Sequence, residues 1–399
     1  MKILQFCSKP PLPSTDGGSL ASYHLSLEID AANNDLALLS IATVKHPFEE
    51  NSINKSVYSG RRTEFVTIDT EITPLKALVN LFSGSSIQSD RFVKVEVEKK
   101  LRVLIDEFKP EVIVLDDIRS AFYLDFLRKT TSAKLLYRSV NIEWLLFKER
   151  AELSRSLTKK AYLAIQAQRL RRLEDRIWKS VDMVLSISNF DIEVAKELNW
   201  ETRNAHFHPF SLPDVGITMS PQPNTFFHLG SMDWEANIEG IRWFCREIWP
   251  SFLEKNADAQ LHLGGRSIGE LEDLKALKGI VIHPTVENAD VFASQYEILI
   301  VPLRSGSGNR IKILQAMARG NIVVSTPKGI EGIPAKESLD YLQFTDQRSF
   351  NKNIEDLINN QERKALIRDN AKRFISNNYG IAQNASRLSA LMTKLLGHG

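Results

Sequence analysis

The sequence predicts an α/β protein built from two doubly wound domains. Its 399 residues exceed what one hydrophobic core usually supports. Apolar runs of strand length alternate with helical patterns in both halves of the chain, and a stretch without periodicity separates the halves. Strands that alternate with helices indicate parallel sheets covered by helices on both faces.

The first half opens on a strand at residues 2–7, followed by a Pro/Gly loop and helical spacing from Leu20. A helix that ends near Pro110 precedes the strand at 112–115, and a long basic and apolar helical stretch is predicted over about 146–180. The other strands of this half are expected at 35–43, 64–69, 133–139 and within 181–191.

The interdomain linker is predicted at residues 201–224, which contain four prolines and little periodicity. In the second half, helices are predicted at 237–256 and 311–320, and a helical tail at 360–397. Strands are expected at 225–231, 259–265, 280–284, 297–303 and 321–326. In a doubly wound domain, ligands bind beyond the carboxyl ends of the strands.

Composition narrows the class of partner. The formal net charge of +2 gives no indication of a nucleic-acid binder. Two distant cysteines form neither a disulfide framework nor a metal cluster, and the histidines form no helical ligand pair, so we expect a reducing compartment and no metal site. Because no signal peptide or membrane span is evident, we expect a cytoplasmic protein.

The stretch "SGSGNRIKILQAMARG", residues 305–320, follows a predicted strand and runs into a predicted helix. Gly306 and Gly308 permit close backbone approach, and the first amides of the helix favour an anion. Arg310 and Lys312 supply a guanidinium fork and a point charge for a diphosphate. The alternative is a strand-to-helix turn with two solvated cations.

Three further segments are predicted near the same ends of the strands. Gly17 and Gly18 directly precede a helix, although such a pair is usually only a turn. Arg138, Asn141 and Glu143 follow a strand, and Glu143 also suits the first turn of a helix.

Gly230 ends another strand, and Asp233 or Asn237 after it suits a helix cap. The basic residues of the helix at 159–180 indicate a solvated face, with attachment to anionic lipid as the minority interpretation.

These blocks, from the Gly-Gly loop through "RSVNIEWLLF", "LGSMDWEANIEGIRWF" and "VPLRSGSGNRIKILQAMARGNIVVST", resemble family 4 of the retaining glycosyltransferases, closest to its bacterial exopolysaccharide and surface-glycan subgroup. The resemblance implies the GT-B fold, two Rossmann-like domains facing a cleft. It implies an acceptor-side domain at 1–205, a nucleotide-sugar domain at 206–377, and a helix at about 378–399 that crosses back to the first domain.

The resemblance also assigns roles. Arg310 and Lys312 match basic positions that stabilise the departing diphosphate. Donor binding falls to residues of the second domain, and acceptor binding to residues of the first. The donor set is Gly230, Asn237, Gly306, Ser307, Gly308, Asn309 and Gln315; the acceptor set is Gly17, Gly18, Arg138, Asn141 and Glu143.

The sequence departs from the family at five positions. Ser307 and Gln315 replace an acidic pair, of which the second glutamate typically binds ribose hydroxyls. Val140 replaces a histidine, and Ser231 and Asn237 stand near positions where many relatives carry arginine and lysine. An amide at position 315 keeps hydrogen bonding without the charge.

The sequence therefore predicts a nucleotide-sugar-dependent hexosyltransferase that acts with retention on a glycan or lipid-linked acceptor. It predicts a UDP- or GDP-linked co-substrate, no separate cofactor, no nucleic acid, and peripheral contact with the inner face of a membrane as an open option. The alternative is a catalytically lapsed relative that binds a nucleotide or acts as a scaffold. An epimerase of the same fold is a weaker option, because we find no histidine and acid arrangement to assign to it.

Overall fold

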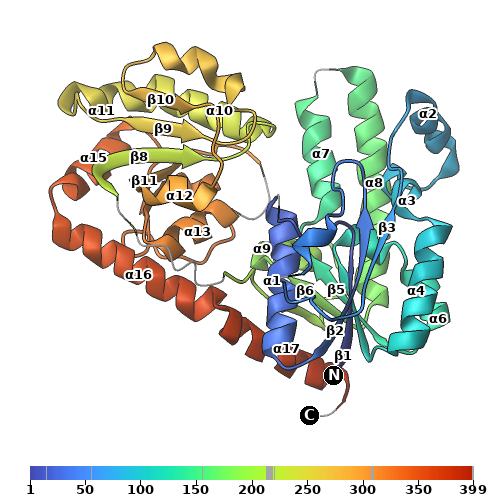
Figure 1. Ribbon diagram of the computed structural model, residues 1–399. Helices are drawn as coiled ribbons and strands as arrows, with labels where there is room; N and C mark the ends of the chain where they lie inside the picture. The colour runs from blue at the N-terminus through green and yellow to red at the C-terminus, as the bar shows by residue number, and fades with distance from the viewer. Residues whose placement is uncertain are drawn as a thin grey trace. The chain divides into compact units, whose positions relative to one another are not determined.

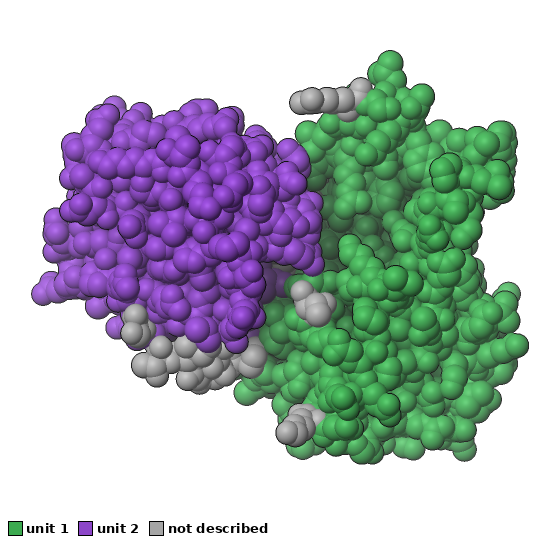
Figure 2. Space-filling model, turned by 45° about the horizontal axis from the view of Figure 1, so that its top comes forward, with its two compact units in different colours: residues 1–211, 381–399 green, residues 212–380 purple. Residues whose placement is uncertain are grey.

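The computed structural model describes residues 1–14, 16–54, 56–154, 156–212, 219, 221–306 and 310–397. The chain forms two compact units (Figure 2): unit 1 comprises Met1–Ser211 with Ile381–Gly399, and unit 2 comprises Leu212–Gly380. The first border lies six residues beyond the predicted one because residues 206–211 bond within unit 1. His208 Nε2 lies 2.5 Å from the Glu28 carboxylate, and Asn384 donates to Ser211 Oγ at 2.8 Å.

Unit 1 is built on a seven-stranded parallel sheet in the order β3-β2-β1-β4-β5-β6-β7. Its central strands are almost wholly buried, which explains their continuous apolar runs. The seventh strand lies inside the segment that the sequence assigned to a linker. The strands are β1 Lys2–Cys7, β2 Asp35–Ala42, β3 Thr63–Thr67, β4 Val112–Asp116, β5 Lys134–Ser139, β6 Met183–Ser186 and β7 Ala205–Phe207.

Helices cover both faces of this sheet (Figure 1). The helices of unit 1 are α1 Gly17–Ala31, η1 Glu50–Ser52, α2 Pro74–Ser83, α3 Ile87–Phe92, α4 Val95–Phe108, α5 Ile118–Ala121, α6 Leu124–Thr130, α7 Glu143–Leu153, α8 Leu157–Ser180, α9 Asn189–Glu197 and α17 Ile381–Leu395. The helical stretch predicted over about 146–180 consists of two helices: α7 ends at Leu153, and α8 begins after Ser156, whose hydroxyl accepts from the Lys159 amide. Serine favours such a cap over a helix interior.

The chain returns to unit 1 at its end. The predicted helical tail is two helices, because the backbone is extended at Gly380 between α16 Gln361–Tyr379 and α17. Leu388 and Met392 of α17 pack into the same core as Leu25 and Ile29 of α1.

Unit 2 carries a second parallel sheet, in the order β10-β9-β8-β11-β12-β13. Its strands are β8 Gln222–Leu229, β9 Leu261–Gly264, β10 Ile280–His283, β11 Tyr296–Val301, β12 Ile322–Ser325 and β13 Leu342–Gln343. Its helices are α10 Glu235–Trp243, η2 Phe244–Ile248, α11 Trp249–Lys255, η3 Ile268–Ala276, α12 Ala289–Ser294, α13 Ile311–Arg319, α14 Pro327–Ile330, α15 Gln347–Ile358 and α16. The predicted helix at 237–256 includes the π-helical turn η2.

The core of unit 2 is rich in edge-to-face aromatic pairs. Phe244 lies 5.0 Å from Phe350 and Phe226 lies 5.3 Å from Trp249, measured between ring centroids. This packing fixes α10, η2 and α11 against the sheet. Across the described residues, no helix combines the length and the apolar character that a membrane crossing requires.

Candidate functional site

The strongest candidate site lies in unit 2, where β8 and β11 end side by side. The sheet order reverses direction between these strands, and ligands of doubly wound sheets bind at that point. Gly230 follows β8 directly, and the loop after β11 leads through Gly306 and Arg310 into α13.

Lys312, in the first turn of α13, reaches back toward β8. Its ammonium donates to Nε2 of His228 at 3.2 Å and to Oδ1 of Asn237 at 3.1 Å. Burial, and next the charge of Arg310, lower the pKa of Lys312 to about 7. Within the described part of the chain, Lys312 forms no ion pair with a carboxylate, so its charge is available to an anion.

His228 orients this lysine and was not among the predicted site residues. The imidazole is buried on β8, and its Nδ1 lies 2.8 Å from the carbonyl oxygen of Ile300 on β11. Burial, and next the charge of Lys312, hold the pKa of His228 well below its ordinary value. The ring is therefore neutral, donates from Nδ1 to Ile300 and accepts from Lys312 at Nε2. A histidine inside an apolar strand, two residues before Gly230, was the available signal.

Gly230 lies close to the side chains of Lys312, His228 and Asn237. A Cβ at position 230 would lie 2.8 Å from Nζ of Lys312, 3.0 Å from Nε2 of His228 and 3.1 Å from Nδ2 of Asn237. The Gly230 amide also donates to the Gly264 carbonyl at 3.1 Å. The position requires glycine because three polar side chains occupy the space that any other residue would fill.

Asn237 connects α10 to α13. Its side-chain amide donates to the carbonyl of Ser231 at 2.8 Å while its oxygen accepts from Lys312. The alternative role as a helix cap is wrong for both candidates. Trp234 occupies the N-cap position of α10 without a side-chain bond, and Asp233 bonds instead to Ser231, Arg266 and Ser267.

Arg310 immediately precedes α13 and is buried. Its guanidinium donates to the Gly306 carbonyl at 2.8 Å and lies 5.0 Å from the ring centre of Trp234. Gly306 has φ +91°, and a Cβ there would lie 2.4 Å from the Trp234 ring. Ser307, Gly308 and Asn309, which the sequence assigned to donor binding, lie outside the described residues.

Gln315 lies three residues beyond Lys312 on α13 and is half-buried. Residues three apart share one helix face, so the Gln315 amide belongs to the same side of α13 as the ammonium of Lys312. The structure therefore brings Gly230, Asn237, Gly306, Arg310 and Lys312 together, with Gln315 on the same helix face as Lys312.

In unit 1, the side chain of Asp16 already occupies the N-terminus of α1. Asp16 Oδ1 accepts from the amides of Gly18 and Ser19, both at 2.9 Å, and from Lys9 Nζ at 2.6 Å. Against the effect of burial, Lys9 lowers the pKa of Asp16 to about 2. The prediction that Gly17 and Gly18 offer free amides to a ligand is thus wrong for Gly18, whose amide Asp16 occupies.

Arg138 does not lie where the prediction placed it. It lies at the end of β5 in the interior, where Nη1 bonds Asp116 at 3.0 Å and the carbonyl of Ala21 at 3.1 Å. Asp116 in turn accepts from Gln5 Nε2 at 2.9 Å. Arg138 is the partner of a buried carboxylate on the neighbouring strand, and this role replaces the predicted one in acceptor binding.

Glu143 begins α7 and faces a charged group. Its carboxylate accepts from Arg119 at 3.3 Å, and Arg119 pairs with Asp117 at 3.1 Å. Although burial opposes it, Glu143 and Asp117 raise the pKa of Arg119. The Glu143 amide donates to the buried Glu174 at 2.9 Å, which fixes the helix start. Asn141 is half-buried in the preceding loop.

The fold defines the class of the protein: two parallel-sheet, Rossmann-like domains of the GT-B type, as predicted. The chain is similar to Anabaena HepE in complex with UDP and glucose, with a TM-score of 0.67 and 10% identity over 98% of this chain and 99% of that one. It is also similar to sucrose-phosphate synthase from Thermosynechococcus elongatus, with a TM-score of 0.70 and 13% identity over 100% of both chains.

Sequence comparison gives a family match that lies within unit 2. Residues 223–360, which hold Gly230, His228 and the described residues around α13, match the family model "Glycosyl transferases group 1". The chain is also 23% identical, over 95% of its length and 96% of the relative's, to a Klebsiella pneumoniae protein named "Uncharacterized 44.6 kDa protein in cps region". The family match and the fold together support a glycosyltransferase.

Proposed function

We propose that this protein is a retaining glycosyltransferase that moves a hexose from a UDP- or GDP-linked donor to a glycan or lipid-linked acceptor. The observation that carries the proposal is Lys312, a half-buried ammonium whose hydrogen-bond partners in the described chain are neutral. A cation desolvated beside Arg310, at the carboxyl ends of β8 and β11, is suited to a dianionic diphosphate.

In the proposed reaction, the bond between the anomeric carbon and the diphosphate oxygen breaks, and a bond from that carbon to the acceptor oxygen forms. The acceptor's hydroxyl proton passes to the departing phosphate oxygen, so no protein base is required. Negative charge grows on the diphosphate as the bond breaks, and Lys312 and Arg310 stabilise it. Asn237 and His228 hold the ammonium in place, and Gln315 is assigned to the donor ribose.

The proposal requires no cofactor beyond the nucleotide sugar, and no metal. Cys7 and Cys245 are both free, which suits a reducing compartment, and we place the protein in the cytoplasm. The UDP complex of the structurally similar Anabaena protein supports a nucleotide diphosphate as the first ligand to test.

Isothermal titration of the full chain with UDP and GDP tests the donor site. We expect one nucleotide to bind, and Lys312→Ala or Arg310→Ala to weaken binding by about 10- to 100-fold, as lost charge-assisted hydrogen bonds do. Lys275→Ala is the matched control, because Lys275 pairs with Glu272 on the surface of the same unit. Binding by neither nucleotide, or equal binding by all variants, would reject the donor site.

A second candidate is a lapsed relative that binds the nucleotide without turnover. Gln315 in place of the typical glutamate, and Val140 in place of a histidine, favour it. Incubation with a panel of nucleotide sugars separates the two, because released UDP or GDP requires turnover. If the protein binds a nucleotide sugar without releasing UDP or GDP, and the Gln315→Glu variant does release it, the lapsed state is established.

A further inference from the structure

Trp234 stands at an unusual place, the start of α10. It occupies the N-cap position with an extended backbone, φ −108° and ψ 113°, and makes no side-chain cap bond. Serine, threonine, aspartate and asparagine are preferred there, because their oxygens accept from a free amide of the first turn. An indole cannot do this, and the Trp234 side chain is half-buried. The stability of α10 therefore does not explain a tryptophan at this position.

The residues before Trp234 fix its backbone. Asp233 accepts from Arg266 and Ser267, both at 2.6 Å and both in the loop after β9. The Met232 amide donates to the Arg266 carbonyl at 2.8 Å. Because the segment before α10 is bonded to the neighbouring loop, the indole is attached to a backbone that is held in place.

The loop after β11 packs against the indole. A Cβ on Gly306 would lie 2.4 Å from Cζ2 of Trp234 and 3.1 Å from Cβ of Ala236. With φ +91°, Gly306 also has a backbone conformation that other residues rarely adopt. The loop thus approaches the ring as closely as only a glycine allows.

Arg310 lies over this ring. Its guanidinium carbon is 5.0 Å from the ring centre of Trp234, and its Nη2 donates to the Gly306 carbonyl at 2.8 Å. A guanidinium that lies over an aromatic face keeps the N–H donors in its own plane for other partners. A carboxylate in the place of the ring would also hold the arginine, but it would offset the charge that a diphosphate requires.

The other cation of the site is held in a similar way. Lys312 donates to His228 at 3.2 Å and to Asn237 at 3.1 Å, and both partners are neutral. Neutral groups thus position both cations at the start of α13.

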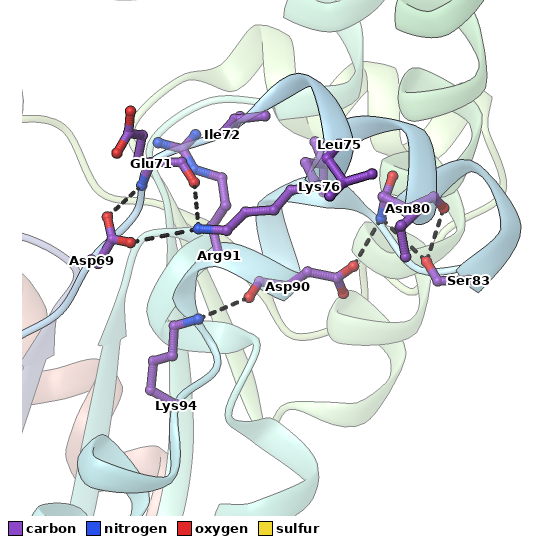
Figure 3. A pocket seen from close by; sticks show the side chains of 12 residues that line it. Asp69, Glu71, Ile72, Leu75, Lys76, Asn80, Ser83, Asp90, Arg91 and Lys94 are labelled. Carbon is purple, nitrogen blue, oxygen red and sulfur yellow. Dashed lines mark hydrogen bonds and ion pairs between the residues drawn. The ribbon is translucent and has the colours of Figure 1, made fainter.

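A cavity in unit 1 shows the opposite arrangement. It has a volume of about 390 Å³ and lies between α2, α3 and the loop before α2 (Figure 3). Lys76 pairs there with Asp69 at 3.5 Å, and Glu71 and Asp90 also line the cavity. Carboxylates offset the charge of the cations in that cavity, which the indole of Trp234 does not do for Arg310.

We propose that Trp234 is a positioning residue for Arg310, whose guanidinium the indole holds at the diphosphate site before the donor binds. Because the arginine is already held, less side-chain freedom is lost when the diphosphate arrives. This role rests on the proposed donor site, and it adds a residue that acts on the nucleotide only through Arg310.

Titration of the full chain with UDP and GDP, followed by the nucleotide that binds more tightly, tests this role. Trp234→Leu should weaken binding by about tenfold, and Trp234→Phe, which keeps an aromatic face, should recover most of the loss. The matching nucleoside, uridine or guanosine, has no diphosphate, so its affinity should be the same in all three proteins. An equal loss for the nucleoside would mean that the indole contacts the base, and would overturn the proposal.

A double-mutant cycle separates positioning from an independent contact. If Trp234 acts only through Arg310, the variant that carries both Trp234→Leu and Arg310→Ala binds no more weakly than Arg310→Ala alone. Losses that multiply would overturn the proposal. If the leucine variant does not fold, Trp234→Met takes its place in the cycle, because methionine fills similar space without a ring.

A control variant removes an equivalent ring elsewhere. Phe126 of unit 1 lies under the guanidinium of Arg102, at 5.3 Å, and Phe126→Leu should leave nucleotide binding unchanged. If the parent protein binds neither nucleotide, the donor site is rejected, and the role of Trp234 with it. If Arg310→Ala weakens binding but Trp234→Leu binds like the parent protein, the donor site stands and the role of Trp234 alone is wrong.

Discussion

The ammonium of Lys312 donates to Nε2 of His228 across 3.2 Å, so a helix and a strand of unit 2 share one hydrogen bond between two titratable side chains. Both pKa values are lowered, and in each case burial is the main cause. A phosphate is the partner that would reverse this effect on the lysine, because an anion favours its charged form.

Binding of UDP should therefore be coupled to proton uptake. Lys312 has a pKa of about 7, so at pH 8 it is mostly neutral in the free protein, and a bound diphosphate raises that pKa. The protonated form binds better, so affinity is greatest below pH 7 and falls as pH rises toward the pKa of the complex. Calorimetric titration with UDP at pH 8, in buffers of different ionisation enthalpy, should show that binding takes up about one proton. The Lys312→Met variant should not take up this proton. No difference between buffers would contradict this coupling.

Replacement of His228 should weaken UDP binding indirectly, through its effect on Lys312. His228→Leu removes the acceptor at Nε2 and should weaken UDP binding by about tenfold, the effect of one hydrogen bond to a charged group. His228→Gln can retain an acceptor there and should recover most of the loss. His262→Leu on β9 is the control, because His262 bonds His283, at 3.0 Å. Equal losses in the leucine and glutamine variants would argue against this role.

Gly230→Ala should impair the site more than the fold. The new Cβ meets the ends of Lys312, His228 and Asn237 at 2.8 to 3.1 Å, and the flexible lysine can move aside. We expect about tenfold weaker UDP binding with a small change in melting temperature. Gly269→Ala, where a Cβ meets nothing within 4 Å, should change neither. An alanine variant that binds UDP like the parent protein would show that the close approach is unimportant.

The ion pair of Arg138 and Asp116 should contribute to stability. Asp116→Ala leaves a buried guanidinium without its carboxylate, which typically costs about 3–5 kcal/mol. The exposed pair of Arg176 and Asp125 is the comparison, and Asp125→Ala should cost less than about 1 kcal/mol. Urea denaturation monitored on unit 1 measures both. Similar midpoints for the two variants would remove the structural role assigned to Arg138.

Local pattern predicted the two sheets well, because strand burial and helical spacing are encoded in short segments. The helix after Arg310 and the strand before Gly230 are examples. The break between α7 and α8 was missed because the apolar and basic pattern continues across the serines at 154 and 156. A single hydroxyl cap decides that boundary.

Side-chain partners were harder to predict, because they depend on pairing between distant segments. Arg138 follows a strand, as ligand-binding residues do, but its partner Asp116 stands 22 residues earlier on the adjacent strand. His228 and Lys312 are separated by 84 residues. Only the register of β8 beside β11, and α13 after it, brings them within bonding distance.

The return of α17 to α1 has a consequence for how the protein is made on the ribosome. Unit 2 is continuous in sequence from Leu212 to Gly380, so all of it is translated before α17. Unit 1 begins first but receives Leu388 and Met392, which pack into the same core as Leu25 and Ile29, only after the residues of unit 2 have been translated. The first unit to be synthesised is therefore the last to be completed, and a truncated chain would expose part of the α1 surface.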